Sequence, residues 1–116
     1  MKPIINYEGN NLYLKQDEYT INGRVYLGLV KKNGELFEDI TINLPDVELN
    51  DDEICLNSNL QRDLKNKLYE TDVFMNMFRE EQYNMGKYDV VFINKNLISE
   101  YRYDNEREVT NELWNC

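Results

Sequence analysis

The stretch INGRVYLGLVKKNGELFEDITINL, residues 21–44, decides the fold. It contains two Asn-Gly pairs, Asn22-Gly23 and Asn33-Gly34, which stand eleven residues apart between runs of β-branched, aromatic and aliphatic residues. Both central residues of a type I′ turn need a positive φ, which Asn tolerates and Gly adopts without penalty. Such a turn also matches the twist of the strands that it joins. The pattern therefore predicts two type I′ hairpins and a three-stranded meander over about residues 11–44.

The first strand of this meander, residues 11–21, changes its pattern along its length. Its apolar residues occupy even positions up to Leu14 and odd positions from Tyr19 onward. One extra residue in a strand moves all later side chains to the opposite face. The change predicts a β-bulge or a break near residues 16–18.

The second and third strands alternate more regularly. Residues 24–32 carry apolar side chains on both faces, which predicts the central strand of the meander. Residues 35–44 alternate between an apolar and a polar face, with Phe37 and Glu38 as exceptions. The polar side of this strand is expected to face solvent or a ligand.

The alternating strand pattern ends after the meander. Pro45 has no N–H to give to a strand ladder, so it ends the third strand. Residues 46–53 follow as an acidic loop, and residues 54–56 are predicted to form a short strand.

A helical pattern follows this short strand. Leu60, Leu64 and Leu68 recur at the spacing of one helix face. Ser58 can cap such a helix, and Gln61 can reach back to the Ser58 amide as a capping box. These residues predict an amphipathic helix that covers one face of the sheet.

The next two segments complete the expected sheet and its cover. Residues 71–85 fit both a helical stripe and strand alternation, and we expect a helix, either as a helical hairpin or as a kinked continuation of the first helix. Residues 87–93 are predicted to form a strand that is buried on both faces and joins the meander. The fold class is thus an α+β domain with helices within residues 58–85.

The C-terminal part combines a helix with a charged tail. Asn94 to Asn96 can cap a last helix, which carries Leu97, Ile98 and Tyr101. Residues 102–116 are highly charged and are expected to be a docked helix or a frayed extension. The candidate contacts of this tail with a partner or a second copy are its apolar residues Val109, Leu113 and Trp114.

Composition limits the classes of function. A chain of 116 residues with 41% hydrophobic residues is expected to be one globular domain, residues 1–116. Thirteen basic and twenty-two acidic residues give a net charge of -9, which disfavours direct binding to nucleic acids and to anionic membranes. No apolar leader or membrane-length segment is apparent, so we expect a cytoplasmic protein. Nine tyrosines favour protein recognition, although Tyr also replaces Phe on half-exposed strands.

The residues for common catalytic chemistry are missing from the sequence. The chain has no His, which excludes Ser-His and Cys-His nucleophiles and His-ligated zinc. Cys55 and Cys116 lie too far apart in the sequence for a CxxC motif and are expected to be free thiols. The acidic loop does not match an EF-hand, because Asp51 stands where the turn needs Gly. We therefore expect no enzyme activity, no cofactor and no metal site.

One segment resembles a known family. Residues 34–44, GELFEDITINL, are similar to a hairpin strand with the pattern Gly-Glu-x-Phe-x-x-(Leu/Ile)-Thr-(Val/Ile)-Asn-Leu. This strand, with the hairpin that precedes it from residue 18, resembles the domain of unknown function 4313. That family comprises small acidic proteins of conjugative elements and phages of low-GC Gram-positive bacteria. The resemblance implies a genomic context of this kind, and it implies no active site.

These observations lead to a hypothesis about function. We expect a non-enzymatic, acidic, protein-binding accessory of a phage or mobile element, in its most specific form an inhibitor of a host defence nuclease that mimics nucleic acid. The alternatives are a small ligand-binding or metal-binding domain or a carboxylate-based enzyme, and a homo-oligomeric structural protein. The candidate partner-binding face comprises Tyr26, Glu35, Phe37, Glu38, Asp39, Asp46, Glu48, Asp51, Asp52 and Glu53.

Overall fold

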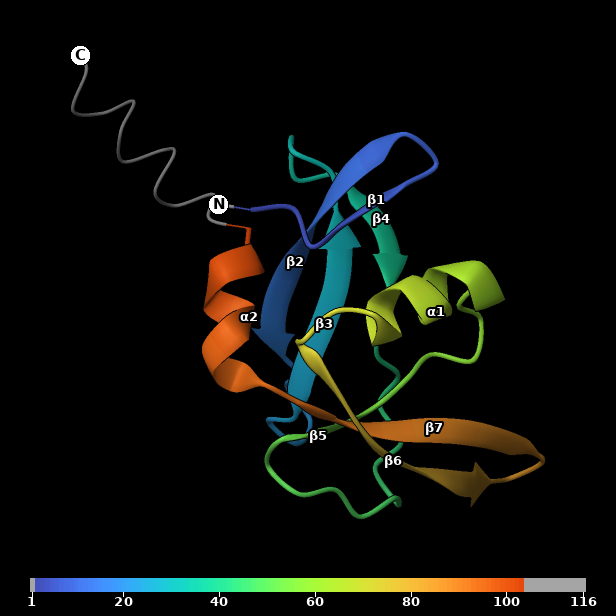
Figure 1. Ribbon diagram of the computed structural model, residues 1–116. Helices are drawn as coiled ribbons and strands as arrows, with labels where there is room; N and C mark the ends of the chain where they lie inside the picture. The colour runs from blue at the N-terminus through green and yellow to red at the C-terminus, as the bar shows by residue number, and fades with distance from the viewer. Residues whose placement is uncertain (1, 104–116) are drawn as a thin grey trace.

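The computed structural model describes residues 2–103, apart from the side chains of residues 76–78. It has an α+β fold with a four-stranded sheet, a three-stranded sheet and two short helices, and both sheets are antiparallel (Figure 1). The elements in chain order are β1 (Ile5–Tyr7), β2 (Asn10–Glu18), β3 (Val25–Val30), β4 (Leu36–Asp39), β5 (Glu53–Cys55), α1 (Arg62–Tyr69), β6 (Phe74–Tyr83), β7 (Gly86–Ile93) and α2 (Lys95–Tyr101). The predicted α+β class is confirmed.

The predicted meander forms most of the first sheet. The strand order is β1-β2-β3-β4, so β3 is paired on both sides as expected of the central strand. β1 was not predicted. It joins β2 through Glu8 and Gly9, which both have a positive φ, of 51° and 78°, as a type I′ turn requires.

The two Asn-Gly pairs make hairpins, but their predicted turn type is wrong. Gly23 and Gly34 have φ values of 69° and 88°, whereas neither Asn22 nor Asn33 has a positive φ. Each Asn side chain instead accepts a hydrogen bond from the backbone N–H two residues ahead, that of Arg24 at 3.2 Å or that of Glu35 at 2.9 Å. The loops are therefore longer than two residues, with Asn as a side-chain cap and Gly as the left-handed residue.

The irregularities of the meander have a clear structural cause. β2 ends at Glu18 and pairs with β3 without a shift of register, so the change of pattern near residues 16–18 reflects a break and no bulge. The bulge lies in β4, between the pairs Leu29–Glu38 and Val30–Leu36. Phe37 is the extra residue, which explains why it departs from the alternation of its strand.

Most of the segment 71–85 is a strand, β6, and the predicted helix is wrong there. β6 forms a hairpin with β7 through a two-residue loop, in which Asn84 has a φ of 56°. Both helix and strand periodicities are present in this segment, and its pairing with the apolar strand that follows determines the outcome. Tertiary contacts thus override the local helical pattern.

The strand predicted at residues 87–93 is confirmed as β7, but it does not join the meander. It lies between β5 and β6 in the second sheet. A single bridge between Thr41 and Leu56 links the two sheets, and the Asn57 N–H donates to the Ile40 carbonyl at 2.8 Å beside it. The expectation of one continuous sheet is corrected to two linked sheets.

The first helix is shorter than predicted, and the second agrees with its predicted bounds. α1 begins at Arg62, so the capping box at Ser58 is wrong, and Gln61 makes no side-chain capping bond. Asn57 holds a turn before the helix, since its side chain accepts from the Asn59 N–H at 3.1 Å. The predicted cap of α2 is confirmed, because the Asn94 side chain accepts from the Asn96 N–H.

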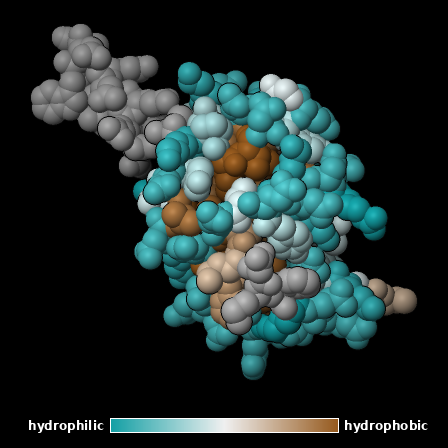
Figure 2. All heavy atoms as spheres, viewed as in Figure 1, coloured by the Kyte–Doolittle hydropathy of each residue, from teal (hydrophilic) through white to brown (hydrophobic). Residues whose placement is uncertain are grey.

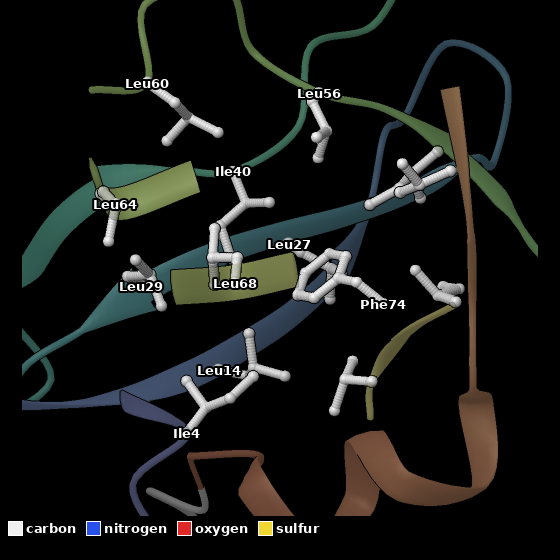
Figure 3. Packing of buried hydrophobic residues seen from close by; sticks show 14 of the residues in the cluster. Ile4, Leu14, Leu27, Leu29, Ile40, Leu56, Leu60, Leu64, Leu68 and Phe74 are labelled. Carbon is white, nitrogen blue, oxygen red and sulfur yellow. The ribbon is translucent and has the colours of Figure 1, made fainter. Parts of the chain in front are cut away.

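The main core lies between the two sheets, and side chains of both helices contribute to it. Leu14, Leu27 and Leu29 of the meander face Leu68 of α1 and Phe74 of β6 (Figure 3). The predicted leucine stripe of the first helix is confirmed as part of this core. Its remaining buried members are Ile4, Tyr7, Leu12, Ile40, Ile54, Leu56, Leu60, Leu64, Val73, Val91, Ile93 and Ile98.

A second, smaller core covers the opposite face of β7. It consists of Leu44, Val47, Cys55 and Val90. Neighbouring residues of a strand point to opposite faces, so Val90 enters this core while Val91 enters the main one. The predicted burial of residues 87–93 on both faces is therefore confirmed.

Several tyrosine hydroxyls hold the elements together. The hydroxyl of Tyr7 in β1 donates to Asp63 of α1 at 2.8 Å, and that of Tyr69 in α1 donates to Asp89 of β7 at 2.7 Å. The bond to Asp63, followed by desolvation, raises the pKa of Tyr7 to about 12. Part of the tyrosine surplus thus has a structural role, since each of these bonds joins two elements.

The close approach of Gly34, in the loop between β3 and β4, to the Tyr103 side chain can be tested by mutation. Gly34 needs its positive φ, and a Cβ there would come within 3.0 Å of the Tyr103 hydroxyl oxygen. Gly23 also has a positive φ but open space around it. Gly34→Ala is expected to lower the free energy of unfolding by about 2–3 kcal/mol and Gly23→Ala by about 1 kcal/mol, as measured by urea denaturation. Equal losses for the two variants would contradict the contact with Tyr103.

Candidate protein-interaction surface

The acidic loop lies over the second core. Leu44 and Val47 are buried beneath it, whereas the carboxylate-bearing residues between them and β5 are exposed. These exposed residues are Asp46, Glu48, Asp51 and Asp52. The loop runs along the lower end of the molecule in Figure 1, and hydrophilic atoms make up the lower rim in Figure 2. Apolar side chains thus fix the loop from below while the four carboxylates face outward.

Two arginines hold the backbone of this loop. Arg24, directly before β3, donates to the Leu44 carbonyl at 2.8 Å and to the Val47 carbonyl at 2.5 Å. Arg79 of β6 donates to the Glu48 carbonyl at 2.8 Å. The bonds to Leu44 and Val47 are partly buried, where a carbonyl needs such a partner, and the single guanidinium of Arg24 serves both. The bond from Arg79 to Glu48 is exposed. The loop is therefore anchored from both sheets.

The buried side chain of Glu53 also holds the loop, through hydrogen bonds to Asn50 and Arg79. Its side chain is only 2% exposed, and it accepts from the Asn50 N–H at 2.9 Å and from Arg79 at 3.3 Å. Burial alone would raise the pKa of Glu53, but the Asn50 N–H and Arg79 outweigh it and lower this pKa below its usual value. Glu53 is therefore a structural residue, and its predicted place on an exposed partner-binding face is corrected.

Two open hollows flank the anchored loop. The first has a volume of about 450 Å³ and the second about 280 Å³, and they share Arg24, Leu49, Asn50 and Glu53. Residues of the β2–β3 loop, Asn22 and Gly23, line the second hollow together with Glu18, Asp51 and Lys95. Their walls are largely polar. Within residues 2–103, no group of three or more Cys, Asp or Glu is placed to hold a metal ion.

The meander part of the predicted face is used mostly within the molecule. The Tyr26 hydroxyl donates to Asp39 at 2.5 Å, and burial, with this bond, raises the pKa of Tyr26. Glu38 accepts from the Asp39 N–H at 3.2 Å. Phe37 packs edge-on against Tyr7, with ring centroids 6.1 Å apart, and contacts the main core. These internal contacts leave little of the surface of Tyr26, Phe37, Glu38 and Asp39 for a partner to bind.

The two parts of the predicted face do not come together. The connection from β3 to β4, which carries the exposed Glu35, lies at the opposite end of the molecule from the acidic loop (Figure 1). The structure thus reduces the candidate surface to the exposed carboxylates of residues 46–52. Val109, Leu113, Trp114 and Cys116 lie outside the described residues.

Sequence reasoning missed the residues that anchor the loop. Arg24 and Arg79 are isolated basic residues in an acidic chain, and neither belongs to a motif. The buried position of Glu53 has one local signal, its place directly before the apolar Ile54, Cys55 and Leu56. Its partner lies twenty-six residues away, so the sequence gives no indication of the pair.

The comparisons with known proteins supply no relative. No family model, no curated protein and no solved structure matches the chain. Neither helix within residues 2–103 has the length and the apolar run that crossing a bilayer requires.

The lowered pKa of Glu53 predicts a pH dependence of stability. A carboxyl group whose folded-state pKa is lowered contributes stability above its unfolded-state pKa and loses it as the pH falls through the folded value. Glu53→Gln is expected to lower the free energy of unfolding by about 1–3 kcal/mol at pH 7, and this difference should shrink below about pH 4.5. Urea denaturation between pH 3 and 7 measures it, with the exposed Glu48→Gln as control. A difference that does not change with pH would contradict the ionised pair.

Proposed function

We propose that the chain is a non-enzymatic acidic protein that binds a basic protein partner through the carboxylates of residues 46–52. One observation carries the proposal. Two guanidinium groups, one from each sheet's side of the loop, bind three of its carbonyls, those of Leu44, Val47 and Glu48, while four acidic residues are exposed.

An anchored loop suits recognition for an energetic reason. Binding costs free energy whenever a flexible segment has to be ordered, and this loop is already ordered by its anchors and its buried side chains. Opposite potentials also speed the encounter and select the partner. A net charge of -9 provides a field of the right sign for a basic surface.

An apolar contact is available beside the charges. Ile21 in the β2–β3 loop is 82% exposed, and its neighbours Asn22 and Gly23 border the same hollow as Asp51. Protein interfaces commonly combine a central apolar anchor with a polar rim. We assign Ile21 as this anchor and the carboxylates as part of the rim.

The most specific form of the proposal concerns the partner class. Carboxylates fixed on a protein surface can occupy the basic channel of a nucleic-acid-processing enzyme. The resemblance of residues 18–44 to small proteins of phages and conjugative elements supplies only a genomic context, and within that context we propose a host defence nuclease as the partner and a cytoplasmic location. A ligand-dependent rise in melting temperature with small molecules would favour the alternative of a small-ligand domain.

A matched pair of variants tests the proposal. The loop variant combines Asp46→Asn, Glu48→Gln, Asp51→Asn and Asp52→Asn. The control variant combines Glu8→Gln, Glu70→Gln, Asp72→Asn and Glu100→Gln, which are exposed residues of other segments. Each variant removes four negative charges, so a difference between them reports the position of the charges and excludes an effect of net charge alone.

The expected result is a selective loss of binding. The immobilised wild type and the control variant should retain a basic protein from a lysate of a low-GC Gram-positive bacterium, and that protein should elute steeply with salt and be displaced by duplex DNA. The loop variant should lose at least ten-fold in affinity, measured by titration calorimetry with the purified partner. Equal binding by all three proteins, or no partner at low salt, would contradict the proposal.

A further inference from the structure

The outer strand of the second sheet has an unpaired edge. Among the strands of residues 2–103, the order β5-β7-β6 leaves β6 paired on one side only, with β7. Figure 1 shows β6 on the outer side of the β6–β7 hairpin, which projects away from the meander. An unpaired edge presents a row of backbone N–H and C=O groups to which another strand can bind.

The hairpin register identifies the groups that point outward. Tyr83 pairs with Gly86 across a two-residue loop, so Tyr83, Glu81 and Arg79 exchange hydrogen bonds with β7. The backbone groups alternate in direction along a strand. Those of Phe78, Glu80 and Gln82 therefore point to the free edge.

Residues 78–83 lack several of the features that protect an edge strand. Natural proteins blunt exposed edges with Pro, with charged side chains and Lys above all, with bulges or with very short strands. These six residues contain neither Pro nor Lys, and the irregularity of β6 lies before them, between Phe74 and Phe78. Their charged residues, Arg79, Glu80 and Glu81, include both signs, so an antiparallel partner strand can set Arg opposite Glu. The edge is thus regular and long enough to accept a partner strand.

We infer that a second copy of the chain binds this edge by antiparallel pairing of β6 with β6 about a two-fold axis at Glu80. In this register Phe78 pairs with Gln82 of the second copy, and Arg79 lies opposite Glu81 of the second copy. Both contacts occur twice, because a two-fold interface is self-complementary.

Charge selects this register over its neighbours. Arg79 and Glu81 already form an ion pair within one copy, with side chains 41% and 36% exposed. Two-fold pairing about Glu80 places these residues in a ring of four alternating charges. A shift of two residues in either direction would set Arg79 opposite Arg79 or Glu81 opposite Glu81 and would lose both Arg79–Glu81 contacts. The register about Glu80 also has one like-charge pair, that of the two Glu80 residues, but it gains these two opposite-charge contacts. The two Glu80 carboxylates meet on the other face, where Lys87 lies 4.0 Å from each within its own copy.

Proline at an outward position tests the pairing without breaking the hairpin. Glu80→Pro removes an N–H that points to the free edge and no bond to β7. Glu80→Gln is the matched control, because it keeps the N–H and removes the repulsion at the axis. Glu81→Arg is a second variant that leaves the backbone intact and places Arg opposite Arg79.

Sedimentation equilibrium of the full chain at about 10–300 μM spans the micromolar affinity expected of a small interface. The wild type and Glu80→Gln should be dimeric. Glu80→Pro should be monomeric with a melting temperature within a few degrees of the wild type, and Glu81→Arg should bind at least ten-fold more weakly. A monomeric wild type would overturn the inference. A dimer that persists in Glu80→Pro would also overturn the inference. If truncation after Tyr103 then abolished this dimer, the contact would lie in the C-terminal segment and not at β6.

Discussion

The burial of β7 on both of its faces is the constraint from which the rest of the structure follows. Val91 and Ile93 are buried in the main core, with residues of the meander and α1. Val90, on the opposite face of β7, is buried in the second core. The chain covers that face with an irregular loop, whose carbonyls cannot pair as those of a strand would. Arg24 and Arg79 satisfy them, and the acidic side chains are left on the outside. The candidate interaction surface is thus a consequence of how the second sheet is covered.

Much of the fold could be predicted because its signals are local. The meander, the leucine stripe of α1, the Asn94 cap and the apolar run of β7 each depend on residues that are close in sequence. Residues 71–85 could not be assigned in the same way, since two patterns fit them equally well. The strand pattern is Val73, Met75 and Met77, and the helical pattern is Val73, Phe74, Met77 and Phe78. Pairing with β7 decided between them, and a single sequence carries no direct signal of which strands pair.

The exposed carboxylates of the candidate site could be predicted from the sequence, but the buried and basic residues that hold the loop could not. An acidic loop after Pro45 follows from composition, and Asp46, Glu48, Asp51 and Asp52 are indeed exposed. Glu53, Phe37 and Tyr26 resemble surface residues in the sequence, yet each has a partner far along the chain, Arg79, Tyr7 and Asp39 respectively. Long-range pairs of this kind decide which acidic and aromatic residues remain for a partner, and they appear only once the chain is folded.

The central claim is that residues 44–53 form an ordered layer over β7, and amide hydrogen exchange tests it most directly. The Val47 N–H donates to the Leu44 carbonyl at 3.0 Å, and the Asn50 N–H donates to the Glu53 carboxylate at 2.9 Å. Both amides are expected to exchange at least about a hundred-fold more slowly than in an unstructured peptide, with protection reduced in Arg24→Ala. Exchange at the rate of an unstructured peptide in the wild type would contradict an anchored loop, and with it the surface assigned to partner binding.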